Sequence, residues 1–207
     1  MNYASIRTCD IANGEGVRVT LFVSGCTHRC KGCFNPDQWD FDYGEPFTRE
    51  VEDRILKELE PSFISGLTIL GGEPMEPANQ RALVPFLRRI ESFRVGIGSD
   101  RVGIGSGAQT QSDAGTTQTD AGTTQSDASK TLADANTTPT APRKTLWVYT
   151  GCLLEELKDP VSRWHTEVTD EFLSMIDVLV DGPFVEAQKD ISLQFRGSAN
   201  QRILHLR

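Results

Sequence analysis

Short runs of apolar and β-branched residues recur along the chain and predict buried β-strands. The first covers residues 17–23 (VRVTLFV) and leads into a serine and a glycine. Three more runs follow at residues 67–70 (LTIL), 145–149 (TLWVY) and 178–180 (VLV), each ahead of a turn that contains glycine. Because these runs are almost continuously apolar, we expect strands that are buried on both faces of a sheet.

Apolar residues at helical spacing lie between these runs. Residues 49–59 show this spacing, and Thr48 precedes them as a candidate N-cap. Similar patterns predict helices over residues 79–90 and 170–176, the latter with Thr169 as its cap. Strands therefore alternate with helices, which is typical of an α/β fold with a parallel sheet and helices packed outside it.

The segment 95–143 departs from this pattern. It contains VGIGS twice and then a seven-residue repeat whose copies begin at Gln111, Gln118, Gln125 and Leu132. It is rich in small polar residues and has no aromatic ones, so we expect a disordered surface loop rather than a coiled coil. With 207 residues, 38% of them hydrophobic, the chain is predicted to form a single domain, 1–207, interrupted by this insert.

Charge and hydropathy narrow the class of partner. The formal net charge of -8 argues against binding to nucleic acid through its phosphates. No run approaches the roughly 20 apolar residues that cross a bilayer, and the amino terminus does not resemble a signal peptide. We therefore expect a cytoplasmic protein that acts on a small molecule or another protein, without a membrane or nucleic-acid partner.

Cysteines supply the first chemical signal. Five are present, and Cys26, Cys30 and Cys33 fall within eight residues. Clustered thiols in a cytosolic chain are typical of zinc or iron-sulfur sites. A closed zinc site would need a fourth ligand such as His28 or Cys9, whereas a four-iron cluster on three thiolates keeps one iron open. The spacing alone leaves both possibilities open.

The loop after the second predicted strand carries a further motif, Gly71-Gly72-Glu73-Pro74. Loops that follow parallel strands gather at one end of a sheet, where ligands bind. We therefore expect this turn to face the cysteine loop. In contrast, we expect His28 to be exposed to solvent, and Cys9 and Cys152 to be small, partly buried residues without a role in the site.

The C-x3-C-x2-C motif, followed by Phe34 and by Gly71 to Pro74, resembles the radical S-adenosylmethionine superfamily. Further stretches at 13–18, 147–151, 178–184 (VLVDGPF) and 196–202 (RGSANQR) are similar to the activating proteins of anaerobic ribonucleoside-triphosphate reductase. The resemblance covers almost everything outside the insert. It implies an abbreviated parallel (β/α) partial barrel of the radical S-adenosylmethionine type.

The resemblance also implies an activity. Cys26, Cys30 and Cys33 would hold one 4Fe-4S cluster, whose fourth iron would chelate S-adenosyl-L-methionine. Reductive cleavage of this cofactor would give a 5'-deoxyadenosyl radical, and the enzyme would use it to generate a glycyl radical on anaerobic ribonucleoside-triphosphate reductase. The implied partners are the glycyl radical subunit of that reductase and a low-potential electron donor such as flavodoxin.

By the same resemblance, the cluster and the cofactor carry the catalysis without further catalytic side chains. The implied cofactor-binding residues are Gly32, Cys33, Phe34, Gly71, Gly72, Glu73, Thr150 and Asp181. The Glu73 carboxylate would pair with the ammonium group of the cofactor. Thr150 and Asp181 end predicted strands, where a turn role is an alternative. Phe34 has an alternative place in the core. Asn200 could contact the cofactor or the partner, with a turn role as the alternative, and we leave it out of the site.

Other functions stay open at this stage. One is an activase of a different glycyl radical enzyme, such as pyruvate formate-lyase. Another is a radical enzyme that acts on a small molecule, which the short chain disfavours because an abbreviated barrel suits a protein substrate. The third is a zinc-binding interaction module without catalysis, which would give no reason for the turn from Gly71 to Pro74.

Overall fold

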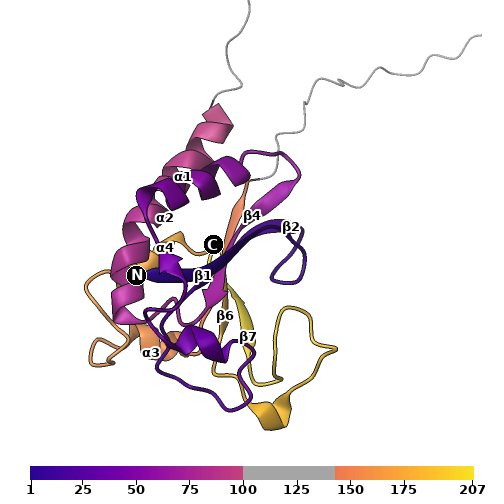
Figure 1. Cartoon of the computed structure of the whole chain (residues 1–207), viewed down its shortest axis with the longest axis vertical. Coiled ribbons are helices and arrows are strands. Elements are labelled where there is room, and N and C mark those ends of the chain that lie inside the picture. Colours follow the sequence, from indigo (N-terminus) through magenta and orange to yellow (C-terminus); the bar gives the residue numbers. More distant parts are fainter. Residues whose placement is uncertain (100–142) are drawn as a thin grey trace, which may run out of the picture.

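The computed structural model describes residues 1–99 and 143–207, with backbone alone for 95–99. Within these ranges one seven-stranded sheet has the order β3-β1-β2-β4-β5-β6-β7 (Figure 1). The strands are β1 (Asn2–Asp10), β2 (Val17–Val23), β3 (Glu45–Pro46), β4 (Ile64–Gly71), β5 (Thr145–Tyr149), β6 (Val178–Asp181) and β7 (Arg202–His205).

Parallel pairing is confined to the middle of the sheet. Strands β2, β4, β5 and β6 pair in parallel, and they contain the four predicted runs. Strands β1, β3 and β7 pair antiparallel at the edges and were not predicted. Their sequences lack a long apolar run because they are largely exposed or half-buried. The prediction of a parallel sheet is therefore confirmed for the centre and wrong for the edges.

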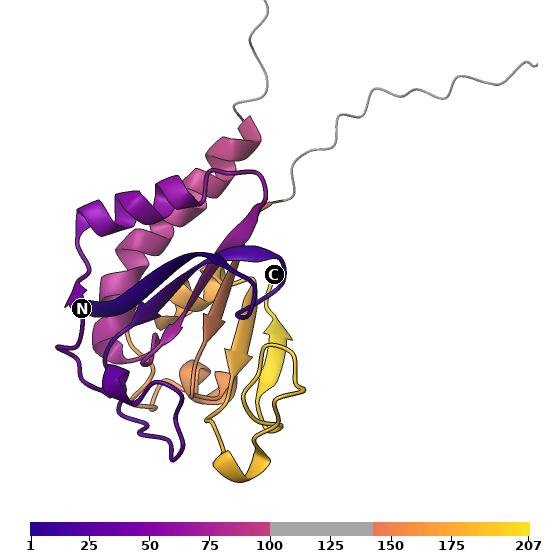
Figure 2. The same ribbon diagram turned by 45° about the vertical axis from the view of Figure 1, so that its right-hand side comes forward.

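Helices and strands share one main core. The helices are α1 (Arg49–Glu58), α2 (Pro77–Ser99), α3 (Leu154–Lys158) and α4 (Thr169–Met175), with two 3-10 turns, η1 (Pro36–Trp39) and η2 (Glu186–Gln188). Side chains from α1, α2 and α4, such as Ile55, Leu87 and Phe172, pack with alternate strand residues, such as Leu21 and Ile69. Figure 2 shows α1 and α2 against the same side of the sheet.

The opposite face of the sheet has a smaller apolar cluster. Trp147, Val178 and Val180 are buried there, and Phe195 and Ile203 pack against them. Phe195 comes from the segment between η2 and β7, so a loop rather than a helix covers this face. The prediction that helices pack against the sheet is therefore confirmed for the face of the main core and wrong for the opposite face.

Two helix predictions need correction. The helix expected to end at Ile90 continues to Ser99, so the first five positions of the predicted insert are helical, while the rest of it lies outside the described residues. Thr169 was expected to cap α4 but is its first helical residue. Its buried hydroxyl donates to Gln80 Oε1 (2.6 Å) instead of capping the helix, a long-range contact that spacing cannot reveal. Thr48 does precede α1, without a side-chain cap bond.

None of the helices in the two described ranges combines the length and the apolar character that a bilayer crossing needs.

Candidate functional site

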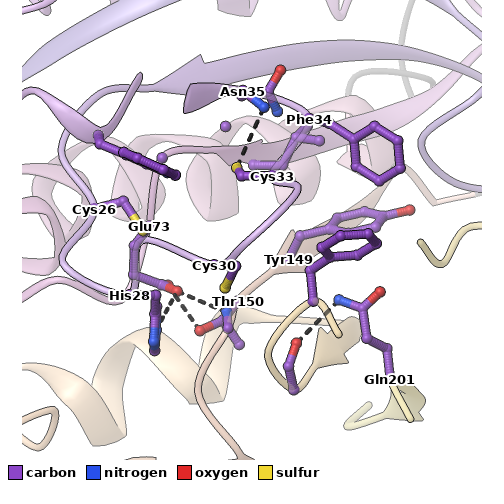
Figure 3. A pocket seen from close by; sticks show the side chains of 17 residues that line it. Cys26, His28, Cys30, Cys33, Phe34, Asn35, Glu73, Tyr149, Thr150 and Gln201 are labelled. Atoms are coloured by element: carbon purple, nitrogen blue, oxygen red, sulfur yellow. Dashed lines mark hydrogen bonds and ion pairs between the residues drawn. The ribbon is translucent and has the colours of Figure 1, made fainter. Parts of the chain in front are cut away.

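A pocket lies where the carboxyl ends of the parallel strands meet, and residues after β2, β4, β5 and β6 all contribute to it (Figure 3). The lining residues that matter most for its chemistry are Cys26, Cys30, Cys33, Gly72, Glu73 and Thr150. The end of α2 and the start of β5 lie at the other end of the molecule (Figure 2). This arrangement agrees with the expectation that loops after parallel strands form the site.

The loop after β2 brings three cysteines to the pocket. Backbone hydrogen bonds shape it: Cys26 N–H donates to Trp39 O (3.1 Å), and Cys33 N–H donates to Cys30 O (3.1 Å). All three thiols are free, and all three residues line the pocket. Asn35 N–H also donates to Cys33 Sγ (3.3 Å).

Burial keeps two of these thiols protonated in the absence of a cation. It raises the pKa of Cys26 to about 12, and the negative charge of Glu73 acts in the same direction. Burial also raises the pKa of Cys30. A metal centre would reverse this balance, because a bound cation stabilises the thiolate. Three soft sulfur donors in one pocket fit an iron-sulfur cluster with one open iron.

The glycine-rich turn packs directly on the cysteine loop, as predicted. Gly72 N–H donates to Val23 O (2.7 Å), and Glu73 N–H donates to Gly25 O (2.8 Å). A Cβ on Gly72 would lie 2.6 Å from Gly25 O. Only glycine allows this approach between the two backbones.

The Glu73 carboxylate is 1% exposed and is surrounded by donors from the protein itself. Its Oε1 accepts Met75 N–H (2.8 Å) and the Thr150 hydroxyl (2.8 Å). Its Oε2 accepts Gly151 N–H (2.7 Å) and lies 3.1 Å from His28 Nε2. A carboxylate has about four acceptor positions, so these contacts account for all of them. The side chain therefore ties the turn to β5 and to the cysteine loop, and these contacts leave no acceptor position for the predicted pair with the ammonium group of the cofactor.

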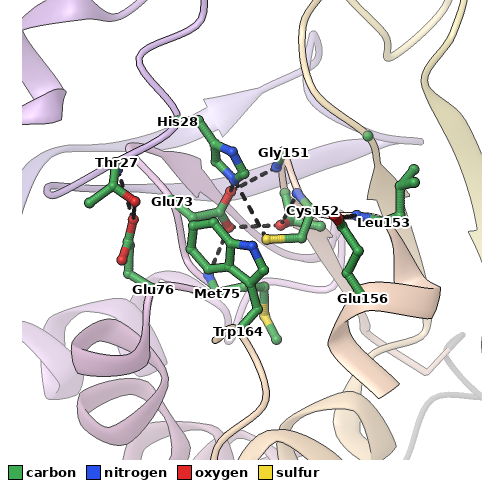
Figure 4. Close-up of polar contacts among 12 residues, drawn as sticks. Thr27, His28, Glu73, Met75, Glu76, Gly151, Cys152, Leu153, Glu156 and Trp164 are labelled. Atoms are coloured by element: carbon green, nitrogen blue, oxygen red, sulfur yellow. Dashed lines mark hydrogen bonds and ion pairs between the residues drawn. The ribbon is translucent and has the colours of Figure 1, made fainter. Parts of the chain in front are cut away.

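His28 contradicts the prediction of solvent exposure. Its side chain is only 17% exposed. The ring stacks on Trp164 with centroids 4.6 Å apart, and Nε2 lies 3.5 Å from Cys152 Sγ (Figure 4). Burial opposes protonation, but the hydrogen bond and charge of Glu73 outweigh it and raise the pKa of His28. The prediction failed because these partners come from three distant segments.

The other predicted site residues divide into two groups. Thr150 and Phe34 line the pocket. Phe34 is 60% exposed and meets Phe184 edge-on at 5.1 Å, so its alternative place in the core is wrong. Gly32 has a positive φ of 74° beside Glu186 and lies outside the lining.

Asp181 also lies outside the lining, fully buried at the end of β6. Its Oδ1 accepts Arg202 Nε–H (2.9 Å), and its Oδ2 accepts Leu154 N–H (2.9 Å) at the start of α3. The side chain thus joins β6, β7 and α3, and the structure offers no contact that supports the predicted cofactor role.

The two outlying cysteines also differ from each other. Cys152 is fully buried next to His28, and burial raises its pKa well above the usual range. Cys9 is exposed on β1, so its predicted partial burial is wrong, because β1 lies near an edge of the sheet.

Several pocket residues were not predicted, among them Trp39, Tyr149 and Gln201. Trp39 Nε1 and Tyr149 Oη are buried and have no hydrogen-bond partner within residues 1–99 and 143–207. Gln201 is fixed by a bond from its Nε2 to Gly182 O (3.0 Å). Gln201 belongs to the RGSANQR stretch, which was the available signal, and neighbouring Asn200 takes the turn role by donating to Pro183 O (2.8 Å).

Comparison with known proteins agrees with this donor set. Residues 12–99 and 124–204 match the family described as "4Fe-4S single cluster domain". The chain is 37% identical over 206 residues to the anaerobic ribonucleoside-triphosphate reductase-activating protein of Pasteurella multocida, covering 98% of this chain and 96% of that protein. The protein of that name from Escherichia coli K12 is 34% identical over 209 residues, with both chains fully covered. The one from bacteriophage T4 is 28% identical over 98% of this chain and 93% of its own.

Proposed function

The chain belongs to the family of anaerobic ribonucleoside-triphosphate reductase-activating proteins, and on that premise we propose that the pocket described above is its working site. The chain is an activating enzyme of the radical S-adenosylmethionine type with one 4Fe-4S cluster. The observation that carries the assignment of the site is that three free thiols line one pocket together with the turn from Gly71 to Glu73, whose backbone bonds to the base of the cysteine loop.

Cys26, Cys30 and Cys33 would hold the cluster. The other possible ligands near the pocket are engaged elsewhere, since His28 pairs with Glu73 and Cys152 is fully buried. Three protein ligands leave one iron for the cofactor. This donor set supports the enzyme over a closed zinc module, which needs a fourth ligand.

The residues around the cysteines would bind S-adenosylmethionine. The backbones of Gly71 and Gly72 would meet the amino end of S-adenosylmethionine, and Cys33 and Phe34 would lie along it. Glu73 and Thr150 would hold this surface in place through the bond between them. Gly32 would act only by shaping the loop. We leave Asp181 out of the cofactor site because Arg202 and Leu154 engage its carboxylate.

When bound, the cluster and S-adenosylmethionine supply the reductive cleavage whose 5'-deoxyadenosyl radical removes a hydrogen atom from a glycine of the reductase. The protein binds the cluster and the cofactor, orients them toward the substrate and excludes competing reactions. The apolar wall of Phe34 and Phe184 would limit the access of water to the reacting centre. Because Phe34 is also exposed, it is placed to meet the reductase.

We further propose that the sheet acts as an abbreviated barrel. Its four parallel strands carry helices on one face, and, among residues 1–99 and 143–207, the other face holds the small cluster around Trp147. That second face would be the barrel interior, open toward the glycine-bearing loop of the reductase. The proposed domain is a single one, 1–207, and a deletion of residues 97–141 bridged by a short linker is expected to retain cluster binding and cofactor cleavage.

The electron must come from outside the chain, since the cysteines provide a single cluster site. We propose a low-potential donor such as flavodoxin, and a cytoplasmic location for the reaction. Reduction of the loaded cluster by reduced flavodoxin, followed by its optical spectrum, tests the first part.

The deciding experiment is anaerobic. The chain is reconstituted with iron and sulfide, reduced and given S-adenosylmethionine, and 5'-deoxyadenosine is measured together with the glycyl radical signal of added reductase. Cys30→Ala should abolish both products, whereas Cys9→Ala, an exposed cysteine outside the pocket, should retain them. Equal activity of Cys30→Ala and Cys9→Ala would refute the assignment. A radical formed on pyruvate formate-lyase but not on the reductase would identify a different partner.

A further inference from the structure

The imidazole of His28 lies inside the cysteine loop but makes its contacts with other segments (Figure 4). Its Nε2 is 3.1 Å from Glu73 Oε2, after β4, and 3.5 Å from Cys152 Sγ, after β5. Its ring stacks on Trp164, between α3 and α4. The ring therefore joins the cysteine loop to three other parts of the fold.

Local packing fixes the orientation of this ring. The ring planes of His28 and Trp164 differ by only 21°. Next to it, a Cβ on Gly151 would lie 2.8 Å from His28 Cδ2, so residue 151 must be glycine for the ring to sit where it does. With the ring held in this way, Nε2 is aimed at the carboxylate of Glu73.

That carboxylate is almost fully buried and has no solvent to replace a lost donor. Its other donors come from the turn itself, through Met75, and from the end of β5, through Thr150 and Gly151. His28 is the donor from the cysteine loop. Removing it would leave Oε2 with Gly151 N–H as its donor and one buried acceptor position unfilled, which is costly because burial keeps water from taking that position.

We propose that His28 is a positioning residue for S-adenosylmethionine, acting through Glu73. By donating from Nε2, it holds the turn from Gly71 to Glu73 at a set distance from the cysteine loop, so that the cluster and the amino-group site keep one geometry. This inference rests on the proposed function. In it, His28 touches neither the cluster nor the cofactor.

Four variants of the full-length, reconstituted chain separate this role from a structural one. His28→Phe keeps a flat ring for Trp164 and removes the donor. His28→Gln restores an N–H donor, and His28→Asn has the same amide on a shorter side chain. His205→Phe, at an exposed histidine of β7, is the matched control.

The measurements are iron and sulfide content, the Kd for S-adenosylmethionine by equilibrium dialysis, and the change that S-adenosylmethionine causes in the EPR spectrum of the reduced cluster. We expect full cluster content in all variants. His28→Phe and His28→Asn should weaken cofactor binding by roughly tenfold, the effect of one hydrogen bond to a charged group, and blunt the EPR change. His28→Gln should recover most of the affinity, and His205→Phe should match the wild type.

A double-mutant cycle tests whether His28 acts through Glu73. In a Glu73→Met background, the substitution His28→Phe should cost little further affinity, because residue 73 no longer offers an acceptor to His28. Additive effects would overturn the proposal, as would wild-type affinity in both His28→Phe and His28→Asn. Loss of iron from all His28 variants, with His205→Phe still loaded, would overturn it in favour of a role in cluster assembly.

Failure of the proposed function gives a different result. If the loaded wild type neither binds nor cleaves S-adenosylmethionine, the site assignment itself falls, and this inference falls with it. In the metal-free full-length chain, trypsin cleavage after Arg29 or Lys31 provides a readout independent of activity. Cleavage should be faster in His28→Phe than in His28→Gln if an N–H donor at residue 28 holds the loop in place.

Discussion

The side-chain amide of Asn79, in the first turns of α2, donates to the backbone carbonyl of Ser24 (3.0 Å), the residue that follows β2. The same amide donates to Glu73 O (2.9 Å), and Asn79 is fully buried. One side chain therefore links α2 to the bases of both the cysteine loop and the glycine-rich turn. Asn79 thus connects a core helix directly to the site.

Replacing Asn79 should destabilise the protein because two buried carbonyls lose their donor. Asn79→Ala is expected to lower the free energy of unfolding by about 2 kcal/mol. Urea denaturation of the metal-free chain, followed by circular dichroism, measures this. Arg81→Ala, on the exposed side of the same helix, is the control and should change stability little. Equal stability of the two variants would contradict the role given to Asn79.

Arg18 is buried to 1% exposure and spans three parallel strands. Its guanidinium donates to Thr68 Oγ1 (2.6 Å), Leu67 O (2.7 Å) and Thr145 O (2.8 Å), and burial lowers its pKa to about 10. Arg18→Met should leave several buried acceptors unpaired and cost about 3 kcal/mol in the free energy of unfolding.

The same urea experiment tests this, with Arg7→Met at an exposed position of β1 as the matched substitution. A stable Arg18→Met variant would mean that the apolar side chain replaces the hydrogen bonds without loss, as happens at some buried ionic sites.

Asp181 should prove structural rather than cofactor-binding. Asp181→Asn weakens the bonds to Arg202 and Leu154 and is expected to cost about 1 to 3 kcal/mol of stability. The Kd of the reconstituted variant for S-adenosylmethionine should stay within about twofold of the wild type. Normal stability together with weaker cofactor binding would return Asp181 to the cofactor site.

Asp10 should make stability depend on pH in the acid range. Burial opposes its ionisation, but hydrogen bonds from Asn13 Nδ2 (2.6 Å) and Ala12 N–H (2.8 Å) outweigh it and lower its pKa below the ordinary value of 3.8. A carboxyl whose folded pKa is depressed stabilises the fold above the unfolded pKa, and this contribution is lost as the pH falls toward the folded value.

The stability difference between wild type and Asp10→Asn should therefore be largest near about pH 6 and shrink toward about pH 3. Denaturation curves of both chains across that range measure it. A difference that is constant with pH would show that the hydrogen bonds of Asp10 do not favour its charged form.

The four central strands and the motifs of the site were predictable from the order of residues alone. Continuous apolar runs such as 145–149 can be buried only between two covered faces, and they became β2, β4, β5 and β6. The spacing of Cys26, Cys30 and Cys33 and the glycines at 71 and 72 are local features. Because loops after parallel strands share one end of a sheet, the proximity of these two motifs followed from sequence order.

Which polar groups meet depends on the fold and could not be predicted from residue spacing. His28 and Cys152 are 124 positions apart, and no local pattern shows that His28 turns toward Glu73 and Trp164. Asp181 was predicted to bind the cofactor because it follows a predicted strand, but in the structure its carboxylate accepts from Arg202 and joins two strands. The antiparallel edge strands escaped prediction because half-buried strands need fewer apolar residues. Hydrogen bonds between distant segments depend on how the chain folds back on itself, and that information is absent from residue spacing.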